Sequence, residues 1–180
     1  YESGAHNGLV LSSKILNSTI YNIRVDSNNF TVDNCEMASY KSNSRFYRLG
    51  GHNHTIKNSN LTGNKSGTDL IAIGGSYNNF TISSNEIKLD GTDFFHLLYI
   101  TSMGDVDTYI LDNNITILNG RFLYGYNSRG WTIKNNLINI SNNVGTYPII
   151  LNRFNDTVIE ENNIVSSRDY PFIIYDNAYN

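Results

Sequence analysis

The sequence predicts an all-β fold, a parallel β-helix of about seven coils with three short strands each, forming a single domain over residues 1–180. A phrase of asparagine, threonine and a β-branched residue recurs along the chain, as in NNFTVDNCEM at 28–37, NNFTISSNEIKL at 78–89 and GWTIKNNLI at 130–138. Turns rich in Asn, Gly, Ser and Asp separate the apolar runs, and no stretch has a helical period. Strands this short bury their apolar side chains only by stacking on equivalent strands of neighbouring repeats.

Alignment of the copies on the threonine gives two apolar columns, one residue and six residues after it. Members of the first column follow at spacings of 12, 24, 26, 28, 23 and 26 residues, so we expect a repeat near 25 residues with an irregular first coil. Leucine-rich repeats have a similar period but a leucine-asparagine signature that this chain lacks, and WD40 repeats need about 40 residues. The columns are Ile20, Val32, Ile56, Ile82, Ile110, Ile133 and Ile159, and Val25, Met37, Leu61, Ile87, Ile115, Ile138 and Ile164.

Alternation along a strand assigns the faces of the repeat. The position before the threonine is expected to point inward, and the threonine itself outward. The position four residues after the threonine is expected at a tight bend, where asparagine tolerates unusual backbone angles and stacked amides can bond from coil to coil. The inward residues are Ser18, Phe30, His54, Phe80, Thr108, Trp131 and Thr157, and the bend residues are Ile23, Cys35, Ser59, Asn85, Asn113, Asn136 and Asn162.

A second family of apolar strands lies between the copies of the phrase. Its members include FYRLGG at 46–51, LIAIGG at 70–75, HLLYIT at 96–101, RFLYGYN at 121–127, PIILNR at 148–153 and PFIIYDN at 171–177. We expect GLVLSS at 8–13 to begin this second family.

From Gly8 to Asp176 the chain resembles the right-handed parallel β-helix proteins of the pectin-lyase-like class. Its Asn-rich, Tyr-rich and cysteine-poor repeats are most similar to the adhesin-like surface proteins of archaea and bacteria. The resemblance implies a fold more than a function, since the same coil carries lyases, hydrolases, epimerases and passive stalks.

Composition excludes several classes of protein. With 29 asparagines, 39% apolar residues and few helix formers, the chain fits neither a disordered segment nor a helical bundle. The net charge of −3 gives no field that would attract nucleic acid, and no apolar run approaches the roughly 18 residues of a membrane span. The single cysteine, Cys35, excludes an internal disulfide framework. Because the chain opens on Tyr1 without a methionine, we expect a segment of a longer or processed protein.

The acidic residues give no catalytic constellation. Asp90 and Asp93 lie in one turn-like segment and Asp105 and Asp107 in another, and we interpret all four as solvated turn carboxylates. A Ca²⁺ site that includes Asp105 and Asp107 is the alternative. We predict no cofactor and no catalytic residue.

The histidines and the cysteine are assigned structural roles. His54 stands in the inward position and is interpreted as a core residue, while His52 and His54 as a metal-binding pair lack an evident third ligand. His96 lies on an intermediate strand, where the sequence provides no partner for it. Cys35 is interpreted as a small buried residue of the bend column.

Two surface features are candidates for recognition. Outward tyrosine and arginine side chains on the intermediate strands would form a glycan-binding strip, whereas the alternative is that several of these tyrosines point inward. Of nine N-x-S/T sequons, four share one position two residues before the outward threonine, which is expected from a repeated corner alone but would become a glycan stripe in a secreted protein. The strip comprises Tyr47, Arg48, Tyr99, Arg121, Tyr124 and Arg153, and the sequon column Asn17, Asn29, Asn53 and Asn79.

The function we expect is that of an extracellular or cell-surface structural module, adhesin-like, which binds a glycan or self-assembles. The alternative is a carbohydrate-active enzyme, a polysaccharide lyase or glycoside hydrolase that acts on an acidic polysaccharide. Solenoids need polar caps to cover their open ends, and neither terminus carries an amphipathic helix. We therefore expect end-to-end self-association or further coils of a parent chain, with no nucleic-acid partner.

Overall fold

The computed structural model describes residues 8–11, 14–17, 23–26, 28–39, 47–63, 69–74, 79–90, 96–119, 121–141, 149–152, 156–167 and 172–175. In these residues the chain forms strands, turns and bends, and every paired strand is parallel to its neighbour. The predicted fold class is confirmed, because the protein is an all-β parallel solenoid. None of the described segments is an apolar helix of membrane-spanning length.

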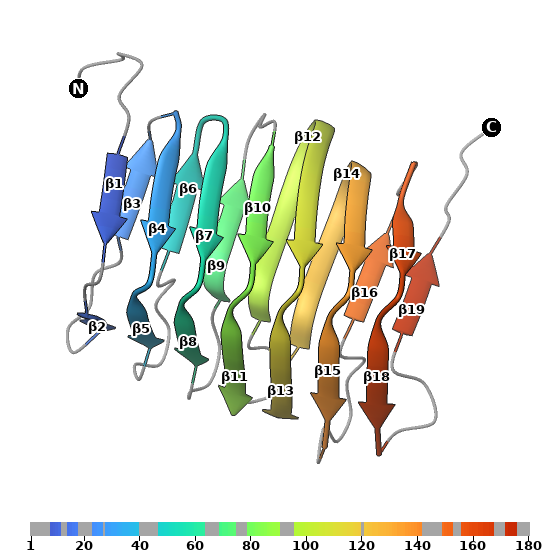
Figure 1. The fold of residues 1–180 in the computed structure, drawn as a ribbon. Coiled ribbons are helices and arrows are strands. Elements are labelled where there is room, and N and C mark those ends of the chain that lie inside the picture. The colour runs from blue at the N-terminus through green and yellow to red at the C-terminus, as the bar shows by residue number, and fades with distance from the viewer. Residues whose placement is uncertain are drawn as a thin grey trace.

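The strands form two sheets that run the length of the solenoid (Figure 1). The seven-stranded sheet contains β2 (Lys14–Asn17), β5 (Glu36–Ser39), β8 (Asn60–Gly63), β11 (Glu86–Asp90), β13 (Asn114–Asn119), β15 (Leu137–Ile140) and β18 (Asn163–Ser166). The twelve-stranded sheet contains β1 (Gly8–Leu11), β3 (Ile23–Asp26), β4 (Phe30–Asp33), β6 (Tyr47–Gly50), β7 (His54–Lys57), β9 (Asp69–Gly74), β10 (Phe80–Ser83), β12 (His96–Leu111), β14 (Arg121–Lys134), β16 (Ile149–Asn152), β17 (Val158–Glu160) and β19 (Phe172–Tyr175).

Each coil passes from one sheet to the other and back. In Figure 1, β4 leads through a short corner into β5, and the chain returns through β6, which lies behind the front strands in this view. The strand colours change in sequence order along the solenoid, so each coil contacts the coils directly before and after it. This arrangement places residues about 25 positions apart in the sequence side by side.

The two predicted apolar columns form the core. Val32, Ile56, Ile82, Ile110 and Ile133 are aligned from strand to strand, and each is at most 1% exposed. The second column is buried to the same extent and consists of Met37, Leu61, Ile87, Ile115 and Ile138. The inward position before the threonine is also confirmed at His54, Phe80, Thr108 and Trp131, all of which are buried.

A buried ladder of polar side chains closes the corner between the two sheets. Its members are Cys35, Ser59, Asn85, Asn113, Asn136 and Asn162, which the sequence assigns to one position of the repeat. The backbone N–H of each member donates to the side-chain oxygen of the next, at 2.9 to 3.0 Å. Each asparagine Nδ2 also donates to an isoleucine carbonyl of the preceding coil, as Asn113 does to Ile82 at 3.0 Å. The expected coil-to-coil hydrogen bonds of stacked asparagines are therefore present.

The unusual backbone angles occur one residue before the ladder rather than on it. Asn34, Asn58, Ser84, Asp112, Asn135 and Glu161 have φ between 50° and 56°, in the left-handed region that asparagine and aspartate adopt more readily than most residues. The N–H groups of all but Glu161 still donate to carbonyls of the next coil, for example Ser84 to Leu111 at 3.0 Å. The bend position predicted for the ladder residues is thus corrected by one residue.

The alignment of the first coil was wrong. The strand that stacks on Phe30–Asp33 is β1, with Val10 opposite Val32, and Ile15 on β2 lies opposite Met37. GLVLSS therefore begins the threonine-phrase family and not the intermediate family. Val25, which the alignment placed in the second column, lies on β3 opposite Leu49. The first coil lacks the Asn-x-Thr phrase, so the alignment matched a later segment, residues 17–25, to the other copies.

The division into about seven coils of three short strands is not kept along the whole chain. β12 and β14 are long strands of 16 and 14 residues. The first part of β12 pairs with β9 and its last part with β10, and β14 pairs in the same way with β16 and then with β17. The register of β12 against β14 shifts after Thr101 and after Asp105, between the part of β12 that pairs with β9 and the part that pairs with β10. In β14, Gly125 makes room for Trp131, because a Cβ at this position would lie 3.0 Å from the indole ring.

Replacement of Ile110 by aspartate tests the core. The variant buries an unpaired carboxylate in the middle of the first column and should lose about 3–5 kcal/mol of unfolding free energy. Urea unfolding followed by circular dichroism measures the loss. The control is Thr81→Asp on the outward face, for which a cost below about 1 kcal/mol is expected. Equal losses in the two variants would contradict the assignment of faces.

Candidate functional site

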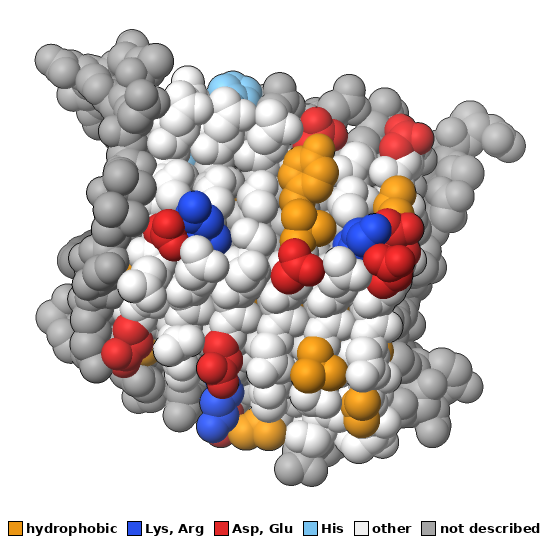
Figure 2. All heavy atoms as spheres, viewed as in Figure 1, with side chains coloured by type: hydrophobic (Ala, Val, Ile, Leu, Met, Phe, Trp, Pro, Cys, Tyr) orange, Lys and Arg blue, Asp and Glu red, His pale blue; other side chains and the backbone are white. Residues whose placement is uncertain are grey.

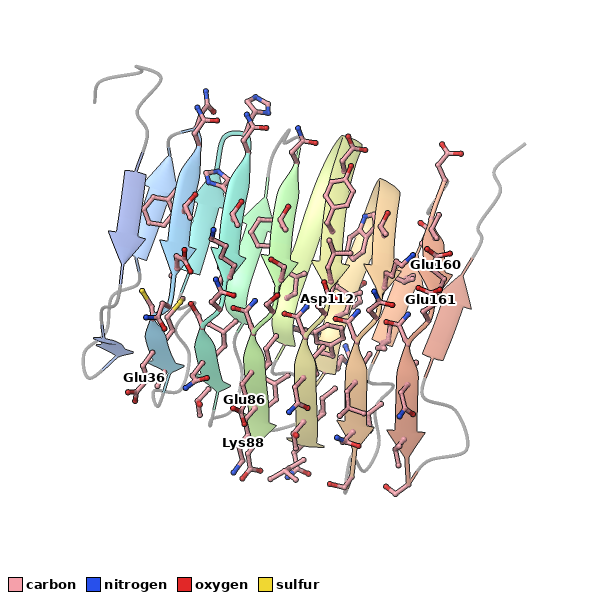
Figure 3. All side chains as sticks on the ribbon, viewed as in Figure 1. Glu36, Glu86, Lys88, Asp112, Glu160 and Glu161 are labelled. Atoms are coloured by element: carbon pink, nitrogen blue, oxygen red, sulfur yellow. The ribbon has the colours of Figure 1, made fainter. Side chains whose placement is uncertain are left out.

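The outward face of the two sheets seen in Figure 2 is flat and carries few charges. Uncharged polar side chains and backbone cover much of this face, and acidic and basic side chains gather at a few separate points, one of them over β11, where Glu86 and Lys88 are exposed (Figure 3). One row of this face consists of Thr31, Thr55, Thr81, Tyr109, Thr132 and Val158, aligned across successive strands. The outward assignment of this row is confirmed, since all its members are at least partly exposed.

Three of the predicted sequon asparagines form a second, fully exposed row. Asn29, Asn53 and Asn79 have φ near 60° and stand one residue before their strands. Their side chains are linked, because Nδ2 of Asn53 donates to Oδ1 of Asn29 at 2.9 Å and Nδ2 of Asn79 donates to Oδ1 of Asn53 at 3.0 Å. Asn17 does not belong to this row, since it ends β2 and is aligned with Ser39.

Of the predicted acidic pair, Asp105 and Asp107, the structure describes only the side chain of Asp107. Asp107 is exposed and continues the asparagine row, with its carboxylate above Gly130 of the next coil, where a Cβ would collide with it. Asp105 is aligned with Arg129, and its side chain lies outside the described part of the structure. Among the side chains that are described, no three His, Cys, Asp or Glu groups are placed to hold a metal ion. The calcium alternative stays a prediction.

Ion pairs between neighbouring coils account for two of the charged points. Lys57 lies 3.3 Å from Asp33, and the hydrogen bond from Asn58, helped by Lys57, holds the pKa of the Asp33 carboxyl below its ordinary value. Lys134 pairs with Glu160 at 2.7 Å and Glu161 at 3.2 Å, and the hydrogen bond to Glu160 raises its pKa. Figure 3 shows the two glutamates together at β17, far along the solenoid from Glu36 on β5 and from Glu86 and Lys88 on β11.

The third chemically distinct point is a cluster of His96, Arg121 and Tyr124 at the beginning of β12 and β14. The strand register places His96 directly opposite Arg121. A guanidinium nitrogen of Arg121 lies 3.4 Å from Nε2 of His96, and the Tyr124 ring is tilted by 60° against the imidazole at 5.6 Å between centroids. His96 is only 7% exposed, whereas Arg121 and Tyr124 reach the surface in part. We refer to these three residues as the His96 cluster.

The chemistry of the His96 cluster follows from its donors. A guanidinium can only donate, so in a hydrogen bond between these two side chains Nε2 of His96 is the acceptor. Nε of Arg121 is buried and has no hydrogen-bond partner among the described residues. The cluster therefore combines a cation, an imidazole and a partly exposed aromatic ring within one small area.

The register divides the predicted glycan-binding strip between rows. Tyr47 falls in the row of Ile71, Leu98, Leu123 and Ile149, whose described members are fully buried. Arg48, Tyr99 and Tyr124 share the next row with Ala72, although the side chains of Arg48 and Tyr99 are not among those described. Arg153 lies outside the described residues. Of the six members, the structure brings together Arg121 and Tyr124.

His96 is the member of the cluster whose contacts with Arg121 and Tyr124 were not predicted from the sequence. It stands 25 residues before Arg121, which is one repeat length, and this spacing was the available signal. His54 and Cys35 are buried as interpreted, at 3% exposure each. His52 is half-buried just before β7, and its N–H donates to Asn28 of the preceding coil at 2.9 Å.

Comparison of the chain with family models, with curated proteins and with solved structures finds no match in any of the three.

The ion pair at Asp33 gives a titration test. Because Asn58 is the largest cause of the lowered pKa, Asn58→Ala should raise the Asp33 pKa toward its ordinary value of 3.8. The folded-state pKa lies below the unfolded one, so the stabilisation by Asp33 is present above the unfolded-state pKa and is lost as the pH falls through the folded-state pKa. Carboxyl NMR titration of both proteins measures the shift, and Asn60→Ala serves as a control without contact to Asp33. An Asp33 pKa that does not move in Asn58→Ala would rule out this explanation.

Proposed function

We propose that the chain is a non-catalytic β-solenoid module that binds a glycan at the His96 cluster. The observation that carries the proposal is the combination of Arg121 and Tyr124 at one surface point, held in place by the buried His96 between them. Sugar rings stack on aromatic side chains through their apolar faces, and their hydroxyls accept hydrogen bonds from guanidinium groups. Both contact types are available within the cluster.

The ligand class follows from the charge of the cluster. Arg121 places a positive charge at this partly exposed point of the surface. A guanidinium binds carboxylates and sulfates in a two-pronged geometry that a neutral hydroxyl cannot match. We therefore favour an acidic glycan, such as one that contains uronic acid, over a neutral one.

The setting we propose is the cell surface. The resemblance to adhesin-like surface proteins of the pectin-lyase-like β-helix class supports this location, as do the row of exposed sequon asparagines and the flat, weakly charged outer face (Figure 2). An extended solenoid holds its side chains at fixed intervals of about 4.8 Å, which suits contact with a polymer.

One observation favours a second candidate, a polysaccharide lyase or glycoside hydrolase that acts on an acidic polysaccharide. His96 lies beside the guanidinium of Arg121 and the phenol of Tyr124, and groups of these types can neutralise a uronate carboxylate and move a proton next to it. A hydrolase would instead need a pair of carboxylates, for which the sequence offers Asp105 and Asp107.

Binding and catalysis are separated by one experiment. The protein is titrated calorimetrically with neutral and uronic-acid oligosaccharides, and product release from uronic-acid polysaccharides is followed with and without Ca²⁺. We expect binding of the acidic ligands and no product. Arg121→Gln and Tyr124→Leu should each weaken binding at least about tenfold, or 1.4 kcal/mol, because each removes one contact type.

Lys88→Gln is the matched control for charge, since Lys88 is exposed on β11 of the other sheet and should leave the affinity unchanged. Equal losses in Lys88→Gln and Arg121→Gln, or no binding of any acidic oligosaccharide, would refute the binding proposal. Product formation that disappears in Arg121→Gln or Asp107→Ala would establish the enzyme instead.

A further inference from the structure

The last coil of the solenoid leaves inward-facing apolar side chains partly uncovered. Ile159 on β17 continues the first core column, yet it is 37% exposed, whereas Val32 to Ile133 in that column are at most 1% exposed. Ile164 on β18 continues the second column and is only partly buried. In the described part of the chain, β17 pairs only with β14 and β18 only with β15. Among the described residues, the coil of β17 and β18 therefore presents partly exposed apolar side chains that continue the two core columns.

The hydrogen bonds of the buried ladder stop at the same edge. From Cys35 to Asn136, the backbone N–H of each ladder residue donates to a side-chain oxygen of the following coil. Asn162 is the last member, and its N–H has no acceptor among the described residues. A partner for this edge must therefore continue both the apolar columns and the row of hydrogen bonds.

The first coil of the same chain has the required pattern. β1 and β2 stack on β4 and β5 in the register that also relates β17 to β14 and β18 to β15. Val10 falls in the row of Ile159, and Ile15 falls in the row of Ile164. Within the described residues β1 pairs only with β4 and β2 only with β5, just as β17 and β18 each pair with one strand.

We propose that a second copy of this chain docks its first coil on the last coil, with β1 of one copy on β17 of the other and β2 on β18. Each junction then extends the two core columns and both sheets without a change of register. The contact joins different surfaces of the two copies and does not close on itself, so repetition gives a head-to-tail fibre rather than a symmetric dimer. The inference is independent of the proposed glycan ligand.

Sedimentation velocity at increasing protein concentration tests the docking. The wild-type chain should form a series of growing oligomers. Ile159→Lys places an ammonium in the junction and should raise the dissociation constant at least about tenfold, since a buried unpaired charge is costly. Thr132→Lys is the matched control, because it adds the same charge to the same outward row one coil away from the junction and should leave association unchanged. A strict monomer at every concentration, or equal effects of the two variants, would overturn the proposal.

A cross-link identifies the junction even if Ile159→Lys folds poorly. Leu9 lies in the row of Thr31 and Val158 in the same row next to Thr132, so the two positions face each other across the proposed junction. Neighbouring strands are about 4.8 Å apart, which is within the Cα separation of disulfides. In a Cys35→Ser background, a mixture of Leu9→Cys and Val158→Cys chains should form the mixed disulfide. Disulfides between two Val158→Cys chains alone would show a symmetric contact and refute the head-to-tail arrangement.

Discussion

Each coil of this protein turns a corner inside a packed core, and the corner places a backbone N–H where no neighbouring strand can accept it. The buried ladder from Cys35 to Asn162 solves this problem once per coil. An asparagine amide both accepts and donates, so Asn113 takes the N–H of Asn85 and returns a hydrogen bond to the carbonyl of Ile82. A buried donor without a partner would cost about 1–3 kcal/mol, and the cost would recur in every coil. The rest of the fold depends on this hydrogen-bonded corner.

The corner also sets the register from which the other features follow. Because the ladder joins equivalent atoms of successive coils, isoleucine stacks on isoleucine in the core and threonine aligns with threonine outside. The same register brings His96 opposite Arg121, although 25 residues separate them. The same register places Ile159, which is 37% exposed, in line with the first core column. Core, candidate site and the proposed docking surface therefore all depend on one repeated geometry.

The repeat itself was readable from the sequence, because burial demands an apolar residue at the same two positions of every coil. The positions Ile56, Ile82, Ile110 and Ile133 were predicted without error, and so was the inward place of His54 and Trp131. The first coil was misassigned, since β1 has Leu9 where later copies have the threonine, and its place in the repeat is recognisable only by its pairing with β4. The sequence also did not predict that β12 is one continuous strand, because register shifts within a strand do not change its amino-acid composition.

The candidate site was less predictable than the fold. Tyr124 and Arg121 were named from residue type, but the partnership with His96 depends on a strand register that the ambiguous segment RFLYGYN does not reveal. Phe122 and Leu123 are both fully buried, so simple alternation fails there and cannot assign faces. Glycan recognition therefore follows from the three-dimensional arrangement of the cluster and not from a motif.

Native-state hydrogen exchange, measured by NMR at low protein concentration, tests the role of the ladder most directly. The N–H groups of Asn85, Asn113 and Asn136 should exchange only through global unfolding, as slowly as those of the core strands, because these three residues are buried and each N–H donates to a side-chain oxygen of the next coil. The N–H of Asn162, which has no acceptor among the described residues, should exchange much faster. Rapid exchange of Asn113 and Asn136 beside a protected Ile110 would contradict the account, since the core would then be stable without the ladder.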